Sequence, residues 1–262
     1  MNIRIAASLL VGALLVTGCS DDSDRPVQGT QELLILVTND DGIAAPGIDT
    51  LVNTLIELDN VEVKVVAPAE NQSGSSDKTT EGDVVWSDSS TTSGYMAVAV
   101  YGYPADSVRV ALEELDITPD LVVSGVNEGP NVGRRSAEIS GTVGAARYAG
   151  RAGFPAVAVS AGIGINPDYD AAAGLVAAWI EDNRNALAND SASTDMVTSF
   201  NVPGCTAGEI RELVEVPLAD AVPEGTNPFF TDCSIEPESP PVNDVDAISK
   251  GHAAVTDVPL EL

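Results

Sequence analysis

Residues 33–42 read LLILVTNDDG, and the fold class of the chain can be inferred from them. The apolar run 33–37 has the length and composition of a strand that is buried on both faces. Pro46 then opens an apolar stripe with helical spacing, and residues 61–68 (VEVKVVAP) form the next predicted strand. The order strand, helix, strand predicts a parallel sheet with a right-handed crossover.

The same alternation continues along the chain. Further strands are predicted at 96–100, 121–123, 155–160 and 253–258, and helices from about Pro104, at 141–152 and at 169–187. Residues 203–242 are rich in Pro, Glu and Asp, and we expect them to form an irregular or hairpin excursion before the last strand. The sequence therefore predicts an α/β fold with a mostly parallel sheet.

The N-terminus carries the features of an export signal. An apolar run over 5–16 is too short for a comfortable membrane-spanning helix, and Gly18-Cys19 resembles a bacterial lipobox. We expect residues 1–18 to be a lipoprotein signal peptide and Cys19 to carry a lipid, with a cleaved secretory signal as the alternative. The protein is then exported and anchored to a bacterial membrane, facing the periplasm or the exterior.

Behind Cys19, residues 19–30 have too little apolar content to pack, and we expect them to form a flexible tether. Residues 31–262 are enough for one large α/β domain. In an oxidising compartment Cys205 and Cys233 can form a disulfide. Two buried thiols are the alternative, because the sequence does not give the distance between the two Cα atoms.

The formal net charge is −28. Binding to DNA or RNA depends on Lys and Arg that neutralise phosphates, so a nucleic-acid polymer is excluded as a partner. A small anionic substrate can still bind where local cations, a metal ion or a helix N-terminus overcome the general field. An acidic surface of this kind also suits a saline environment.

Polar clusters follow three of the predicted strands. They are Asn39–Gly42, Asn71–Gly74 and Ser124–Asn131. Because the carboxyl ends of parallel strands meet at one edge of a sheet, we expect the clusters to converge. Asp40 and Asp41 can present oxygens to one hard cation, and Ser73 and Asn127 add neutral oxygen donors. This donor set favours Mg²⁺ or Mn²⁺; an ordinary surface turn is the alternative for the two aspartates.

An anion-binding site is predicted at Ser140-Gly141-Thr142, where the helix 141–152 begins. Its N–H groups and hydroxyls can hold a phosphate with the help of the helix dipole, although Ser140 as an ordinary N-cap is the alternative. The single histidine, His252, lies far in sequence from every cluster. Its position speaks against histidine phosphatases and Ser-His-Asp chemistry, and we expect it to be structural.

Taken together, these motifs resemble the survival protein SurE family in order and spacing. The matching segments are NDDG (39–42) with APG (45–47), VAP (66–68) with SG (73–74), YPAD (103–106), SGVN (124–127) with GPN (129–131), and SGTV (140–143). A weaker similarity returns at 243–260. The resemblance implies a Rossmann-like three-layer fold and a metal-dependent acid phosphatase that acts as a 5'-nucleotidase on nucleoside monophosphates.

Carried over position by position, the resemblance implies two sets of site residues. The metal ligands are Asp40, Asp41, Ser73 and Asn127. The phosphate-holding residues are Asn39, Asn131, Ser140, Gly141 and Thr142. Asp40 is the candidate nucleophile or general base. A homodimer formed by exchanged arms is also implied, although residues 204–242 do not follow the pattern of the family.

Two other functions stay open from the sequence. One is a broad-specificity exported phosphatase that scavenges phosphate, and the other is a surface lipoprotein that binds a ligand without turnover. A different phosphatase fold with a nucleophilic aspartate is disfavoured, because Gly42 stands where a second aspartate is usual. Arg134 and Arg135 lie in a segment that departs from the family, and they either add phosphate affinity or are simply exposed.

Overall fold

A nine-stranded mixed sheet organises residues 32–262, the part of the chain that the computed structural model describes. In order across the sheet the strands are β3 (Trp86–Ser90), β4 (Met96–Val100), β2 (Val61–Pro68), β1 (Leu33–Thr38), β5 (Leu121–Glu128), β6 (Ala156–Ala161), β7 (Met196–Val202), β11 (His252–Pro259) and β9 (Arg211–Glu215). Only the β3–β4 and β7–β11 pairs of this sheet are antiparallel. The predicted signal peptide, the tether to Thr30 and Cys19 lie outside the described residues.

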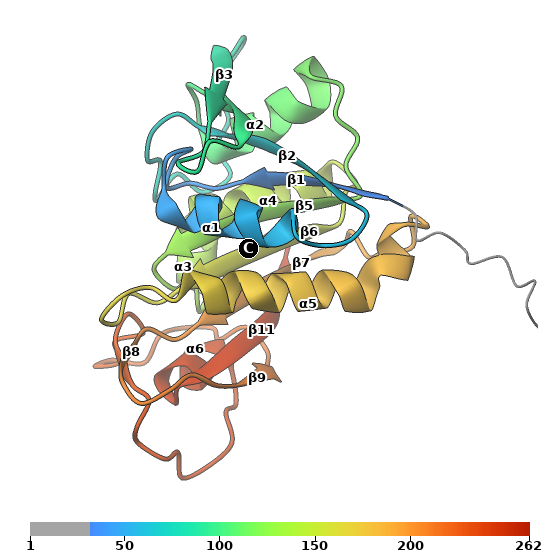
Figure 1. Cartoon of the computed structure of the whole chain (residues 1–262). Helices are drawn as coiled ribbons and strands as arrows, with labels where there is room; N and C mark the ends of the chain where they lie inside the picture. Colours follow the sequence, from blue (N-terminus) through green and yellow to red (C-terminus); the bar gives the residue numbers. More distant parts are fainter. Residues whose placement is uncertain (1–31) are drawn as a thin grey trace, which may run out of the picture. The chain divides into compact units, whose positions relative to one another are not determined.

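Helices cover both faces of the sheet (Figure 1). Helices α1 (Pro46–Leu55) and α5 (Tyr169–Leu187) pack on one face, and α2 (Pro104–Arg109), the π-helical turn η1 (Val110–Glu114) and α4 (Gly141–Arg151) pack on the other. In β1, alternate side chains serve the two cores: Ile35 and Val37 face α1 and α5, whereas Leu36 faces α2 and α4. The predicted three-layer α/β fold is confirmed.

The order of the strands reverses between β1 and β5. The chain adds β2 and β4 on one side of this pair and β6 and β7 on the other. In the register of the pair, Thr38 lies opposite Ser124. Ligands of open α/β sheets bind at such a switch point, outside the carboxyl ends of the strands. Asn39, Asp40 and Asp41 leave β1 at this point.

The structure adds elements that the sequence pattern did not indicate. These are the edge strand β3, the strand β7, and the short helices α3 (Arg134–Ile139) and α6 (Asp244–Ser249). Strand β5 continues to Glu128, so the predicted glycine-rich loop begins later than expected. No helix among residues 32–262 is long and apolar enough to cross a membrane.

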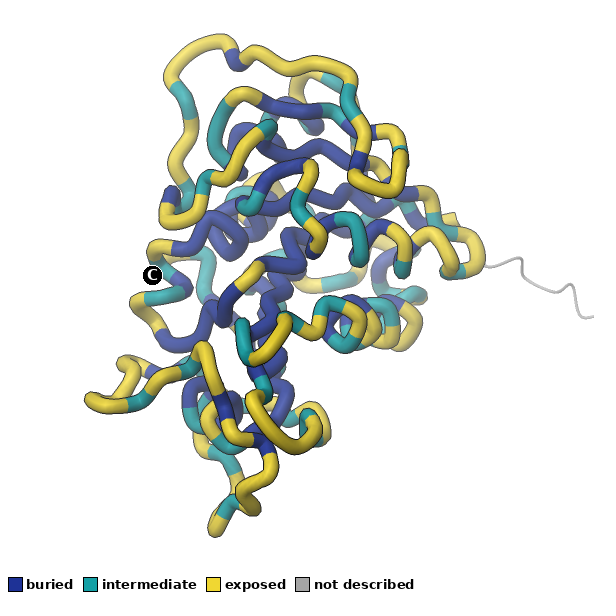
Figure 2. The backbone as a smooth tube through the Cα atoms, turned by 60° about the vertical axis from the view of Figure 1, so that its left-hand side comes forward, coloured by how far each residue is buried: buried dark blue, intermediate teal, exposed yellow. Residues whose placement is uncertain are grey.

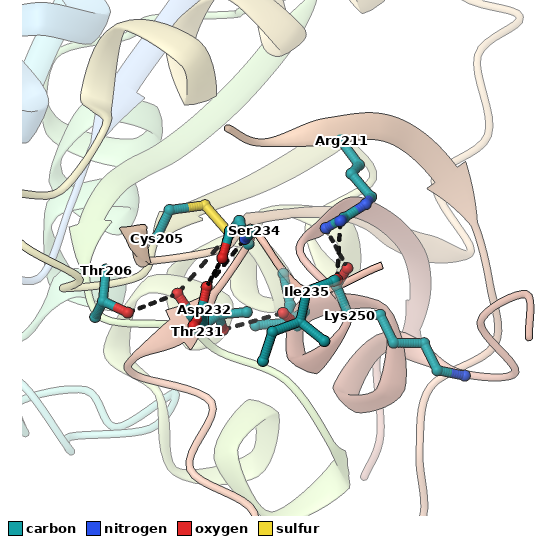
Figure 3. The surroundings of a disulfide bond; sticks show 10 residues. Cys205, Thr206, Arg211, Thr231, Asp232, Ser234, Ile235 and Lys250 are labelled. Carbon is teal, nitrogen blue, oxygen red and sulfur yellow. Dashed lines mark hydrogen bonds between the residues drawn. A yellow bond between two sulfur atoms is a disulfide. The ribbon is translucent and has the colours of Figure 1, made fainter. Parts of the chain in front are cut away.

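The predicted excursion after Pro203 is only partly irregular. Strand β9 joins the main sheet, and β8 (Cys205–Ala207) pairs with β10 (Thr231–Asp232) in a second, two-stranded sheet. A disulfide joins Cys205 to Cys233, with the Cα atoms 5.5 Å apart. Beside it, Arg211 donates to the carbonyl oxygens of Lys250 and Ile235, both at 2.9 Å (Figure 3). Figure 2 shows the contrast between the buried central strands and this mostly exposed segment.

Candidate active site

Asp40 stands buried at the N-terminus of helix α4. The hydroxyl of Thr142 donates to its Oδ1 at 2.6 Å, and both residues are closed off from solvent. Gly141 permits this approach: a Cβ at that position would come within 2.8 Å of the Asp40 Cβ and 2.9 Å of its Oδ2. The structure therefore places Asp40 in contact with the predicted phosphate-binding residues Gly141 and Thr142, although Asp40 and Thr142 are 102 residues apart in sequence.

Asp41 connects the other two polar clusters. Its Oδ2 accepts the backbone N–H of Glu128 at 2.9 Å, and its Oδ1 accepts from the Asn71 side chain at 3.2 Å. Asn71 in turn accepts the backbone N–H of Ser73 at 3.0 Å. Through these bonds Asp41 links the loop of Ser73 to the end of β5, where Asn127 lies.

The two aspartates are held in an environment that disfavours their charged forms. Burial raises the pKa of Asp40, and hydrogen bonds from the hydroxyl and N–H of Thr142 and the N–H of Gly141 oppose the shift. Burial likewise raises the pKa of Asp41 to about 6; the N–H of Glu128 opposes this, and the carboxylates of Asp40 and Glu128 add to it. Neighbouring carboxylates that repel each other are a natural place for a cation.

The donors at this site suit a hard divalent cation. Asn127 donates its Nδ2 to the Gly129 carbonyl at 2.6 Å, and no protein donor among residues 32–262 reaches its Oδ1. No protein donor among residues 32–262 reaches the exposed Ser73 hydroxyl either. No group of three or more His, Cys, Asp or Glu side chains in the described part of the chain could hold a metal ion. The oxygen donors on offer here are two carboxylates and neutral oxygens, a set whose chemistry fits Mg²⁺ or Mn²⁺.

The predicted phosphate-holding residues take different positions. Ser140 is the N-cap of α4, its Oγ accepting the Val143 N–H at 3.1 Å. Asn131 is buried at the ends of β6 and β7, with its side chain donating to Ser160 Oγ at 2.9 Å. Asn39 uses its amide locally: it donates to the Gly42 carbonyl at 2.9 Å and accepts the Gly42 N–H at 3.3 Å. Asn39 thus fixes the turn that orients Asp40 and Asp41.

Two residues near the aspartates, Ser75 and Tyr169, were not singled out by the sequence pattern, and a third, Glu128, lay in the predicted cluster Ser124–Asn131 without a role of its own. The Ser75 Oγ is buried and has no hydrogen-bond partner among residues 32–262, and it lies 2.9 Å from the position that a Cβ on Gly141 would take. Glu128 accepts a hydrogen bond from the Tyr169 hydroxyl at 3.1 Å. A serine in a serine-rich loop and a tyrosine far along the chain carry no sequence signal that could have identified them.

A cavity of about 430 Å³ opens beside Asp41. Its lining includes Glu70, Asn71, Glu128 and the half-buried Tyr169. A larger cavity of about 560 Å³ lies over β2 and β4, and none of the predicted site residues lines it. We place the site at the smaller cavity, because Asp41, whose pKa burial raises to about 6, lines it and the switch point of the sheet is there.

Two arginines and the single histidine considered in the sequence analysis lie away from the two aspartates. Arg135 is exposed and pairs with Glu138 at 2.9 Å. Arg134 is exposed at the start of α3 and forms no ion pair with any residue from 32 to 262. His252 is buried in β11, with Nδ1 3.2 Å from the Glu212 carbonyl oxygen, and it touches none of the site residues through a hydrogen bond within the described range.

Comparison with known proteins gives a consistent result. The family described as "Survival protein SurE" matches residues 35–221. The "5'-nucleotidase SurE" of Methanoculleus marisnigri is 31% identical over 242 residues, covering 87% of this chain and 91% of that protein. The "5'/3'-nucleotidase SurE" of Yersinia pseudotuberculosis is 32% identical over 240 residues, covering 87% and 90%. The crystal structure of the SurE protein from Aquifex aeolicus superposes with a TM-score of 0.69 at 26% identity, covering 87% and 94%.

Proposed function

The chain belongs to the survival protein SurE family, and on that premise we propose that it hydrolyses nucleoside monophosphates to a nucleoside and inorganic phosphate. The protein is a phosphomonoesterase of the 5'/3'-nucleotidase class. The observation that carries this function is the contact of Asp40 with Thr142 and Gly141. It unites a reactive carboxylate and a helix N-terminus that can hold a phosphate.

Members of this family generally use a divalent metal ion, and the residues of this chain fit one. Asp40, Asp41, Ser73 and Asn127 would hold it, and we propose Mg²⁺ or Mn²⁺ because all the donors are oxygens. A bound divalent ion polarises a phosphoryl oxygen and offsets negative charge.

The side chains of the protein orient the substrate and move the proton. The N–H groups of Gly141 and Thr142 at the start of α4 donate to Asp40, and the positive end of the helix dipole there favours a phosphate beside that carboxylate. They also give an anion a favourable position on a chain whose formal net charge is −28. The Asp40 carboxylate, oriented by Thr142, either attacks phosphorus or accepts the proton of the attacking water.

The two roles of Asp40 differ in whether a covalent intermediate forms. A nucleophilic Asp40 displaces the ester oxygen from phosphorus, holds the phosphoryl group as an acyl phosphate and passes it to water, so two displacements retain the configuration at phosphorus. A general base takes the proton of a water molecule that displaces the ester oxygen directly, so one displacement inverts the configuration. The configuration of the phosphate released from a monoester made chiral at phosphorus with oxygen isotopes separates the two roles: retention shows a nucleophile and inversion shows a general base.

A preference for nucleotides is favoured by the cavity beside Asp41. Its wall includes the aromatic ring of Tyr169 as well as hydrogen-bonding side chains, a combination suited to the ribose of a nucleotide. A scavenging phosphatase without nucleoside preference needs no such cavity. The test is phosphate release from a panel of nucleoside monophosphates and from simple phosphomonoesters such as glycerol phosphate. A higher kcat/KM for the nucleotides is expected; equal values for all esters would favour the scavenger.

We also propose that the protein is exported and held at a bacterial membrane by a lipid on Cys19. The support is the sequence of residues 1–19, which has a basic start, a short apolar run and a lipobox-like end. Metabolic labelling with a radioactive fatty acid tests this: the wild type should be labelled and Cys19→Ala should not. Equal labelling of both would exclude Cys19 as the anchor. A homodimer is a further proposal from the family, and it is tested by the mass in solution.

A further inference from the structure

An aromatic side chain from the C-terminal excursion stands beside the active site. The position that a Cβ on Gly129 would take lies 3.4 Å from the Phe229 Cε1 and 3.9 Å from the Asn127 Nδ2. The Phe229 ring and the Asn127 amide therefore flank the same point of the chain. Asn127 is one of the residues that would hold the metal ion, so Phe229 reaches the edge of the site from 100 residues further along the chain.

The backbone around Phe229 is held in place by close contacts. Its carbonyl accepts the N–H of Gly164 at 3.1 Å, and strand β10 begins two residues later, where the Thr231 N–H donates to the Gly204 carbonyl at 2.8 Å. A Cβ on Gly204 would lie only 2.6 Å from the Phe229 carbonyl oxygen. The segment that carries Phe229 can approach β6 and β7 this closely because glycine stands at position 204.

The disulfide closes the segment that carries Phe229. Cys205 and Cys233 are joined across the β8–β10 pair, and the Thr206 hydroxyl adds a bond to the Thr231 carbonyl at 3.1 Å (Figure 3). Both covalent and hydrogen-bonded contacts thus lie within a few residues of Phe229.

Phe229 keeps 43% of its surface exposed although it is a large apolar residue. Its neighbour Phe230 is 48% exposed but lines a separate cavity together with Thr226 and Lys250, in which Phe229 takes no part. The Phe230 ring therefore lines that separate cavity, whereas the Phe229 ring lies beside Gly129. Tyr169, the other aromatic residue near the site, is fixed by its hydroxyl to Glu128 and packs against Gly47, so it forms a wall of the cavity.

We propose that Phe229 is a specificity-determining residue on which the base of a nucleoside monophosphate stacks. The inference rests on the proposed nucleotidase function and names the part of the chain that recognises the nucleoside. Every base has a π-face, so a phenyl ring gives a preference for nucleotides over plain phosphate esters without selecting one base. Phe229 lies outside residues 35–221, the range that matches the family model.

The test compares Phe229→Ala with the matched control Phe230→Ala. The purified proteins are assayed with AMP and with glycerol phosphate, which has no ring. Loss of a base–aromatic stack should lower kcat/KM for AMP by between about fivefold and about 150-fold in Phe229→Ala and leave the value for glycerol phosphate unchanged. Phe230→Ala should match the wild type on both substrates, and Phe229→Trp should restore activity on AMP.

Equal losses on both substrates, or no loss on AMP, would overturn the proposal. Equilibrium binding of adenosine provides a second readout that does not depend on turnover. We expect Phe229→Ala to weaken adenosine binding by a similar factor and Phe230→Ala to leave it unchanged; unaltered binding in Phe229→Ala would overturn the proposal. Absence of phosphate release by the wild type from every ester would instead refute the proposed function, and adenosine binding would still decide the role of Phe229.

Discussion

The Thr142 hydroxyl lies 2.6 Å from Asp40 Oδ1, in a contact that joins the end of β1 to the first turn of α4. The bond is buried and reaches a carboxylate, the class of hydrogen bond that contributes most to stability. It also fixes the orientation of the group that we place next to the reacting phosphorus.

Replacing Thr142 by valine should affect stability and activity together. Valine keeps the volume but leaves Asp40 Oδ1 without its donor, so the free energy of unfolding should fall by about 2 kcal/mol. Thr142→Ser keeps the hydroxyl and is the control. Urea unfolding and phosphate release from AMP measure the two effects. A Thr142→Val protein as active and as stable as Thr142→Ser would show that the bond has no role.

Gly141→Ala should abolish phosphate release. The added Cβ would lie 2.8 Å from the Asp40 Cβ and 2.9 Å from both Asp40 Oδ2 and Ser75 Oγ, which is too close for any of them to stay in place. Gly174→Ala is the matched control, because Gly174 is exposed in α5 and nothing lies within 4 Å of its Cβ position. There alanine should stabilise the fold by up to about 1 kcal/mol and leave activity intact. Full activity in Gly141→Ala would contradict the packing described.

The effect of pH on stability should be visible at Asp77. Burial by itself raises the pKa of Asp77, but Arg147 and Arg151 outweigh it and hold that pKa below its ordinary value. The Asp77 Oδ2 lies 3.5 Å and 3.0 Å from their respective Nη2 atoms. A carboxyl with a lower pKa in the folded chain stabilises the fold above the unfolded pKa of about 3.9, and this contribution is lost as the pH falls through the folded value.

The measurement is the unfolding free energy of wild type and Asp77→Asn across acidic and neutral pH. The advantage of the wild type should be largest at neutral pH and should shrink as the pH falls below about 4. A difference between the two proteins that stays constant from neutral pH down to about pH 3 would exclude this role of Asp77.

Removing the Cys205–Cys233 disulfide should loosen the excursion. The bond closes a loop of sequence separation 28, for which the chain-entropy estimate is about 3 to 4 kcal/mol. The double variant Cys205→Ser/Cys233→Ser should therefore be cut by proteases between the two positions at concentrations that leave the oxidised wild type whole. The reduced wild type serves as a second sample without substitutions. Equal resistance of the three samples would show that the hydrogen bonds of β8 and β10 are sufficient.

Much of this fold follows from local sequence pattern. The apolar run 33–37 predicts a buried strand, and the helix 169–187 was predicted at the bounds it takes in α5. The parallel-sheet rule then brings together residues that follow different strands, which is why Asp40 and Asp41 could be associated with the clusters after Pro68 and Val123. Strand β7 (MVTSFNV) was not predicted, because its short mixture of polar and apolar residues gives little signal outside the sheet.

The parts that the sequence did not indicate depend on long-range packing. Ser75 is one of several serines in its loop, and only the fold places its hydroxyl near Gly141. Phe229 lies in a segment without periodicity, and its position beside Gly129 depends on backbone contacts with Gly164 and Gly204. No spacing rule relates such residues to the active site. Asn39, assigned to the phosphate by resemblance, has its amide engaged with Gly42.

The central claim is that Asp40, with a divalent ion, cleaves phosphate monoesters at the N-terminus of α4. The most direct measurement is phosphate release from AMP by wild type and Asp40→Asn, each with Mg²⁺, with Mn²⁺ and after treatment with EDTA. We expect release by the wild type with at least one ion, loss of release in EDTA that is reversed by adding the ion, and a decrease of about a hundredfold or more in Asp40→Asn. Release that persists in Asp40→Asn, or no release by the wild type with either ion, would contradict the claim.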